Sequence, residues 1–207
     1  MQDTKTQLIQ TCQEITKRVE HLKSQGKSVG FVPTMGALHA GHFSLIQDSL
    51  KQTDATIVSI YVNPTQFGPN EDFNKYPKRL EADVKKCSEL GVHTVFAPID
   101  QEIYPHGKNL SFKVVPPKEY TDVLCGASRP GHFEGVSTIV TKLFNIIPAH
   151  KAFLGLKDAQ QLFIIKKLVE SLNINIQIVP CKTYREQDGL ACSSRNLNLD
   201  SESRLLA

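Results

Sequence analysis

The chain has 207 residues, with 24 basic against 21 acidic side chains and a formal net charge of +3. Apolar residues make up 40% and charged residues 22% of the sequence, which is typical of a globular protein with a sizeable core and too apolar for a disordered chain. The even charge balance argues against a nucleic-acid-binding or membrane-surface protein and favours a small-molecule partner.

The start of the chain and its cysteines indicate where the protein works. No apolar run approaches the roughly 18 residues of a membrane-spanning helix, and the polar start lacks the apolar stretch of a secretory signal. The five cysteines are widely spaced and form no Cys-x-x-Cys pair, which argues against a disulfide framework and a zinc site. We therefore expect a cytoplasmic protein with reduced thiols.

Helical and strand patterns alternate through the first half of the chain. Apolar residues from Leu8 to Leu22 recur at spacings of four and three, which predicts an amphipathic helix. Short apolar or β-branched runs next to Pro or Gly predict buried strands. In chain order we expect a helix over 8–26, a strand over 29–32 that Pro33 ends, a helix over 41–52, a strand over 56–62, a helix over 80–91 and a strand over 94–97.

The second half continues the alternation. We expect a short strand over 112–115, a helix over 136–147, a strand over 152–154, a helix over 162–169 and a strand over 174–178 near the edge of the sheet. After Pro180 the sequence predicts no further strand or long helix. Residues 1–180 should therefore form one domain, and residues 181–207 the opening segment of a second, incomplete one.

Strands alternating with helices in units of about 30 residues predict an α/β fold, with a Rossmann-like, doubly wound parallel sheet and flanking helices. Such sheets bind ligands at the carboxyl ends of their strands. The chemistry should therefore follow Val32, Val62, Leu154 and Val179.

The loop after the first predicted strand, Pro33-Thr34-Met35-Gly36-Ala37-Leu38-His39-Ala40-Gly41-His42, carries two histidines three residues apart. At a helix start, this spacing places both imidazoles on one face beside free backbone N–H groups, and the glycines allow close approach of a phosphate. Two surface histidines are one alternative, and a metal site with no evident third ligand is another. The position at the end of a strand in an open sheet favours nucleotide phosphate binding.

Polar side chains also follow two later strands. Asn63 and Gln66 come directly after the central strand, where their amides would reach the crevice of the sheet. Lys157 can neutralise a phosphate and Asp158 can accept hydrogen bonds from ribose hydroxyls. The alternatives are an Asn-containing turn for the first pair and a solvated helix start for the second.

These blocks resemble a known family. His39-Ala40-Gly41-His42 matches the His-x-Gly-His signature of nucleotidyltransferases and class I aminoacyl-tRNA synthetases, and Pro33-Thr34-Met35-Gly36 is similar to the pantoate–β-alanine ligases. The resemblance extends from about Val29 to Asn196 and includes five further blocks: Val62-Asn63-Pro64-Thr65-Gln66-Phe67, Tyr76-Pro77, Arg129-Pro130-Gly131-His132-Phe133-Glu134-Gly135-Val136, Gly155-Leu156-Lys157-Asp158-Ala159-Gln160-Gln161 and Ser193-Ser194-Arg195-Asn196.

The resemblance implies a homodimeric ligase that joins pantoate to β-alanine, consumes ATP and uses Mg²⁺ held through the ATP phosphates. It implies that the catalytic residues are His39, His42, Lys157 and Arg195. The implied ATP-binding residues are Pro33, Thr34, Met35, Gly36, His39, His42, Gly155, Lys157, Asp158, Ser193, Ser194 and Arg195. The implied pantoate-binding residues are Met35, Asn63, Gln66, Arg129 and Gln161.

The expected chemistry needs no general base, because the carboxylate of pantoate, with a reference pKa of about 4, is ionised at neutral pH. Catalysis must then come from positioning and charge stabilisation around the phosphates. Arg129 has an alternative role in a salt bridge at a helix start. Two rival functions remain: a different His-x-Gly-His nucleotidyltransferase, which would need a cationic pocket for a second phosphate, and an inactive nucleotide-binding or dimerisation module.

Overall fold

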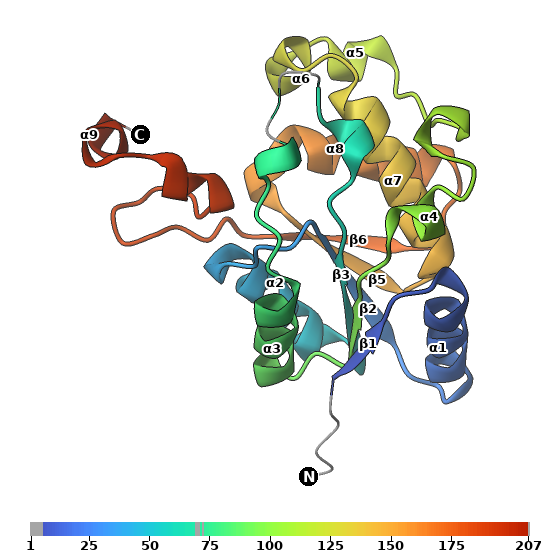
Figure 1. The fold of residues 1–207 in the computed structure, drawn as a ribbon. Coiled ribbons are helices and arrows are strands. Elements are labelled where there is room, and N and C mark those ends of the chain that lie inside the picture. Colours follow the sequence, from blue (N-terminus) through green and yellow to red (C-terminus); the bar gives the residue numbers. More distant parts are fainter. Residues whose placement is uncertain (1–5, 69–70, 72, 207) are drawn as a thin grey trace.

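The computed structural model describes residues 6–68, 71 and 73–206. Within these ranges one sheet has the strand order β1-β4-β3-β2-β5-β6, and every neighbouring pair of strands is parallel (Figure 1). The predicted Rossmann-like α/β fold is confirmed. The strands are β1 (Gln7–Ile9), β2 (Val29–Thr34), β3 (Ala55–Ile60), β4 (Thr94–Phe96), β5 (Lys151–Gly155) and β6 (Gln177–Cys181).

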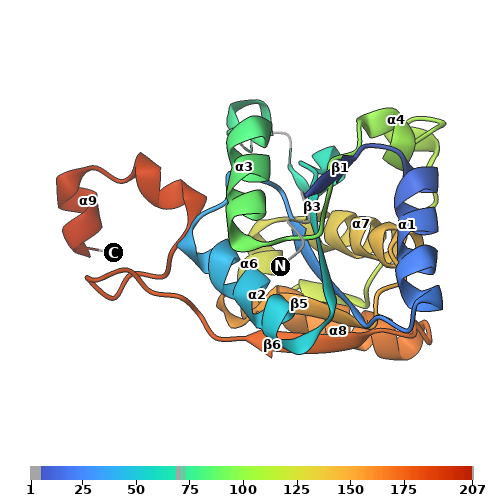
Figure 2. The same cartoon turned by 90° about the horizontal axis from the view of Figure 1, so that it is seen from below.

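Helices cover both faces of the sheet, as a doubly wound fold requires (Figures 1 and 2). The cluster of buried side chains on one face draws on α1 (Cys12–Ser24), α7 (His132–Ile146) and α8 (Ala159–Ser171). The cluster on the other face draws on α2 (Ala40–Gln52) and α3 (Leu80–Leu90). Shorter helices lie in the connections: α4 (Asp100–Ile103), α5 (Lys118–Thr121), α6 (Leu124–Ser128) and α9 (Ser201–Leu206).

The order of the strands locates the place where a ligand should bind. From β2 the chain moves outward to β3 and β4, and it then returns to the other side of β2 to form β5 and β6. The direction of winding therefore reverses between β2 and β5. In open α/β sheets this switch point leaves a crevice at the carboxyl ends of the two strands.

The prediction for the N-terminus was wrong in one respect. Leu8 lies in the edge strand β1 rather than in the first helix, and its side chain is 44% exposed. The helix begins at Cys12, after Thr11, whose hydroxyl accepts the backbone N–H of Glu14 as an N-cap. Because β1 is so short, its apolar residue fell by chance on the spacing of the helix that follows.

Proline did not end the strands where it was expected to. Pro33 lies inside β2, opposite Ser59 of β3. The backbone N–H of Tyr61 donates to the carbonyl of Thr34, so the residue before Thr34 directs its missing N–H toward β5. The pairing of β2 with β5 involves Gly30 and Phe31 and has ended by that point. Pro33 therefore costs the sheet no hydrogen bond.

The last strand was also misplaced, because β6 begins at Gln177 and includes Pro180, whereas the prediction was 174–178. The N–H of Gln177 donates to the carbonyl of His150, next to β5. Alternate residues face opposite ways, so Pro180 directs its missing N–H away from the sheet. The strand predicted over 112–115 does not form, and Phe112 is 99% exposed.

Residues after β6 form an arm that extends away from the sheet (Figures 1 and 2). An antiparallel bridge joins Arg185 to Ala191, and a short 3-10 helix, η5 (Ser194–Asn198), follows. Arg204 pairs with Glu186 and Asp188 and so holds the arm together. None of the helices within the described ranges has the length and apolar character that crossing a membrane would require.

Candidate active site

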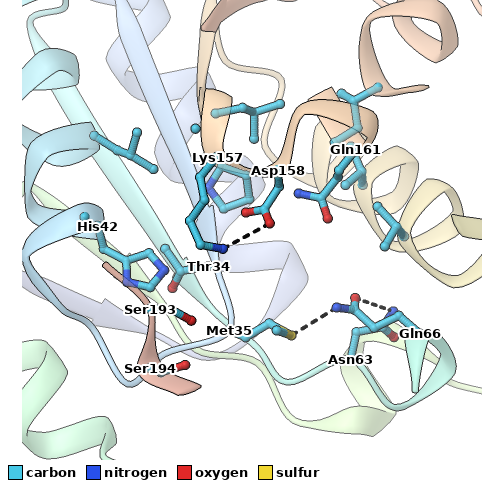
Figure 3. A pocket seen from close by; sticks show the side chains of 18 of the residues that line it. Thr34, Met35, His42, Asn63, Gln66, Lys157, Asp158, Gln161, Ser193 and Ser194 are labelled. Atoms are coloured by element: carbon cyan, nitrogen blue, oxygen red, sulfur yellow. Dashed lines mark hydrogen bonds and ion pairs between the residues drawn. The ribbon is translucent and has the colours of Figure 1, made fainter. Parts of the chain in front are cut away.

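A cleft with a cavity volume of about 270 Å³ opens at the switch point between β2 and β5. Its walls contain every residue of the predicted ATP, pantoate and catalytic sets except Gly36. Figure 3 shows that Lys157, Asp158 and Gln161 approach the cleft from one side, while Met35, Asn63 and Gln66 lie together on another. Residues far apart in the sequence, such as His39 and Cys192, which are separated by 153 positions, therefore meet at one site.

His39 and His42 cap the start of α2 for each other. The Nδ1 atom of His42 accepts the backbone N–H of His39 at 3.3 Å, and Nδ1 of His39 accepts the N–H of Gly41 at 3.2 Å. A Cβ atom at position 41 would lie 3.0 Å from the His39 ring, so glycine allows that ring to fold back over the helix start. In a neutral imidazole whose Nδ1 accepts, the proton is on Nε2. The capping contacts therefore leave both Nε2–H groups as donors.

The same surroundings keep both imidazoles neutral. Burial lowers the pKa of His42 to about 3, with further lowering by His39 and Lys157. Burial, followed by the charge of Lys157, also lowers the pKa of His39. At neutral pH the pair therefore acts through hydrogen bonding rather than through positive charge, and Lys157 supplies a cation beside it.

Lys157 and Asp158 follow β5 in a 3-10 turn, η4 (Leu156–Asp158), and their side chains form an ion pair of 3.2 Å (Figure 3). Ser193, Ser194 and Arg195 reach the same cleft from the arm. The thiol of Cys192, just before them, lies 3.4 Å from Nδ1 of His39. This contact links the arm to the start of α2.

Asn63 occupies a different kind of position. Its side chain is only 1% exposed, and its amide donates to Oε1 of Gln66 and to the carbonyl of Gly135. Its Oδ1 accepts from the hydroxyls of Thr65 and Tyr104. The amide of Gln66 points in turn to the sulfur of Met35 at 3.1 Å. Asn63 therefore holds Gln66 in the wall of the cleft, and its own hydrogen-bonding capacity is taken up by the protein.

Arg129 lies in a network with Glu71 and His132. Its Nε and Nη2 atoms donate to the two oxygens of Glu71 at 2.8 and 2.7 Å. Its Nη1 contacts Nε2 of His132, and Nδ1 of His132 contacts the carbonyl of Gln66 at 2.9 Å. Because arginine only donates and a carbonyl only accepts, His132 carries its proton on Nδ1. The salt bridge that was the alternative for Arg129 is thus present.

Gly36 is the one predicted binding residue that does not line the cleft. It adopts a left-handed conformation with φ of +80°, and a Cβ atom there would lie 2.9 Å from Ile60 and 3.0 Å from the carboxylate of Asp83. Glycine is therefore required by the turn itself and by its protein neighbours. The expectation that Gly36 brings the backbone to a phosphate stays a prediction.

The sequence did not reveal two of the groups that shape the site. Glu71 and Tyr104 hold Arg129 and Asn63, but each comes from a segment with no periodic pattern. Their partners lie 58 and 41 residues away, so only the folded chain brings them together. The sequence offered one signal for Glu71, namely that it is an acidic residue in the loop after Gln66.

Comparisons with known proteins agree with this geometry. The family model for pantoate-beta-alanine ligase matches residues 7–207. A pantothenate synthetase of Caldicellulosiruptor bescii is 52% identical over 95% of this chain, which corresponds to 69% of the relative's length.

Two solved structures resemble the chain closely. The pantothenate synthetase of Thermus thermophilus has a TM-score of 0.91 and 40% identity, over 98% of this chain and 71% of that one. The pantoate-beta-alanine ligase of Francisella tularensis, solved with beta-gamma ATP and beta-alanine, has a TM-score of 0.89 and 43% identity, over 95% of this chain and 74% of that one. The chain therefore belongs to the pantoate–β-alanine ligase family.

Proposed function

We propose that this cleft joins pantoate to β-alanine in two steps, with ATP consumed and pantothenate, AMP and pyrophosphate formed. One observation carries the proposal. The neutral imidazole donors of His39 and His42, the cation of Lys157 and several amide side chains all line one cavity. The imidazoles and the cation suit phosphates, and the amides suit a small hydroxy acid. Family membership makes the acid pantoate and the nucleotide ATP.

In the first step, a carboxylate oxygen of pantoate attacks the α-phosphorus of ATP. The new O–P bond gives pantoyl adenylate, and the bond to the β-phosphate breaks, so that pyrophosphate leaves with the electron pair. Negative charge grows on the phosphate oxygens, where His39, His42, Lys157 and Arg195 stabilise it. Thr34, Gly155 and Asp158, together with Ser193 and Ser194, would hold the rest of the nucleotide.

In the second step, the neutral amine of β-alanine attacks the acyl carbon of the adenylate. The new C–N bond forms pantothenate, the C–O bond to AMP breaks, and the amine proton passes to solvent. Gln66 and Gln161 would keep the pantoyl group in place through its hydroxyls. Among the described residues, no hydrogen bond joins the side chain of Gln161 to another group, so its amide is available to a ligand.

The side chains of the cleft also indicate how Mg²⁺ would be held. The described residues include no group of three His, Cys, Asp or Glu side chains arranged around a metal ion. Asp158 is the one carboxylate among the described residues that line the cleft. These residues fit an ion that is held chiefly by the nucleotide's phosphates and water, as is usual for Mg²⁺. When bound, Mg²⁺ would offset charge on the pyrophosphate leaving group.

The arm and the exposed segment near Phe112 support two further parts of the proposal. Residues 182–206 stand apart from the sheet and carry Ser193, Ser194 and Arg195 into the cleft, as the start of a lid domain would. Leu110, Phe112 and Val115 expose apolar side chains close together in the sequence. A second copy of the chain would cover them in a homodimer, and Phe112→Ser should shift the protein from dimer to monomer in analytical ultracentrifugation.

Exchange of labelled pyrophosphate into ATP tests the proposed function. The exchange should require pantoate and should not require β-alanine, because it reports the first step alone. A phosphate ester that replaces pantoate in this assay would identify a different nucleotidyltransferase. No exchange with pantoate, in a folded protein that binds ATP, would contradict the proposal.

A further inference from the structure

A buried carboxylate of α3 reaches into the loop that precedes the two histidines. Asp83 is only 4% exposed, and its two oxygens accept the backbone N–H groups of Ala37 at 2.8 Å and Leu38 at 2.9 Å. These contacts join positions 45 and 46 residues apart in the sequence. The neighbouring Glu81 of the same helix is exposed.

The loop has a conformation that it would not hold by itself. Gly36 and Ala37 are both left-handed, with φ of +80° and +50°. Alanine is strained there because its Cβ crowds the backbone, and strain of this kind persists only when the surroundings impose it. Thr34 holds the other side of the turn, since its hydroxyl accepts the N–H of Gly36 and donates to the carbonyl of Ser59. Asp83 supplies the remaining constraint.

The constraint acts directly on the proposed phosphate site. Leu38 is followed immediately by His39, whose backbone N–H and ring take part in the reciprocal capping with His42 and Gly41. Met35, at the other end of the loop, lies against Gln66. A shift of the segment between them would move His39, a proposed phosphate donor, together with Met35 of the acyl wall, the part of the cleft that we propose to hold pantoate.

We infer that Asp83 is a positioning residue for adenylation: its carboxylate holds the backbone of Ala37 and Leu38 so that His39 and His42 face the nucleotide phosphates. This inference rests on the proposed function of the cleft. Asp83 has no contact with the substrate in this role. It acts through the loop, because a displacement of about 1 Å is enough to impair a reacting geometry.

The main test is Asp83→Asn, which keeps the shape of the side chain but turns an N–H group toward a backbone N–H group. We expect kcat for pyrophosphate exchange to fall about tenfold or more, whereas the Kd of pantoate should change less than twofold. Glu81→Gln is the matched control on the same helix and should behave like the parent protein. Wild-type kcat in Asp83→Asn would overturn the inference.

A rescue experiment separates positioning from other roles of a carboxylate. Glycine adopts the left-handed conformation without strain, so Ala37→Gly should restore several-fold of the lost kcat in the Asp83→Asn background and have little effect alone. A loss that high Mg²⁺ concentration repairs and Ala37→Gly does not would show that Asp83 serves the metal, and it would overturn the inference.

Hydrogen exchange in the parent protein gives a result that depends neither on a variant's folding nor on activity. The amides of Ala37 and Leu38 should exchange far more slowly than those of an unstructured loop, and Asp83→Asn should remove that protection. Rapid exchange in the parent protein would contradict the role of Asp83. A protein with protected amides and no pantoate-dependent exchange would contradict only the proposed function.

Discussion

The two walls of the cleft use polar side chains in opposite ways. On the phosphate wall, the side of the cleft that we propose to bind the ATP phosphates, backbone N–H groups at the start of α2 donate to Nδ1 of His39 and His42 and leave each Nε2–H as a donor. On the acyl wall, Asn63, Arg129 and His132 direct their polar atoms at protein partners. The donors of the first wall suit the charge stabilisation that we propose for the reaction, and the second wall is a connected network that fixes the shape of a pocket.

The largest effect should follow from removing a donor on the phosphate wall. We expect His42→Ala to lower the rate of adenylation by roughly 10²-fold or more, because a preorganised donor to a developing charge is lost. Pantoate binding should change little. Pyrophosphate exchange measures the rate, and calorimetry measures the binding.

His106→Ala, at an exposed position, is the control for that change. It should leave both measurements as they are. A folded His42→Ala protein with the parent rate of exchange would show that His42 is not a phosphate donor.

Asn63→Ala should destabilise the fold around the acyl wall rather than act directly on the reaction. The substitution removes partners of Gln66, Gly135 and Tyr104 in a buried place, so the free energy of unfolding should fall by about 2 kcal/mol. Urea unfolding measures this loss. Asn145→Ala, which removes an exposed amide on α7, should cost much less. An equal loss of unfolding free energy in the two variants would show that the buried hydrogen bonds of Asn63 do not stabilise the fold.

Gln161→Ala and Gln66→Ala should act on pantoate alone. We expect the Kd of pantoate to rise about tenfold in each, since a lost hydrogen-bond partner costs about 1 to 3 kcal/mol, while the Kd of ATP stays within twofold. Calorimetry with each substrate gives both values. Equal weakening of ATP and pantoate would remove these residues from the pantoate pocket.

The last effect is absent near neutral pH and grows only as the solution becomes acidic. The pKa of His42 is about 3 in the folded protein and 6.5 in an unfolded chain, so unfolding takes up a proton between these values. The free energy of unfolding should therefore decrease as pH falls from 6.5 toward 3, by at most about 1.4 kcal/mol per pH unit from this group. His42→Gln should reduce that slope in urea unfolding at several pH values, and more than His132→Gln on the acyl wall. An unchanged slope would show that burial does not hold His42 neutral in the folded protein.

The sequence predicted the frame of the molecule better than the details of its polar contacts. Helices α3, α7 and α8 were predicted from apolar residues at helical spacing, and the His-x-Gly-His block predicted the two histidines that line the cleft. The three-residue strand β1 was missed because it is too short to show a period. The salt bridge of Arg129 with Glu71 and the contacts of Asp83 with the loop depend on pairs of distant segments, and a single sequence carries no signal for such pairs.

Pro180 affects whether copies of the protein can aggregate through the edge of the sheet. It lies in β6, the strand at one edge of the sheet, and its missing N–H faces outward. An edge strand otherwise offers a row of free donors and acceptors on which a strand of another molecule can add. Because the ring of Pro180 interrupts that row, a foreign strand cannot continue its ladder along β6, which protects a concentrated solution of the protein from aggregation through this edge.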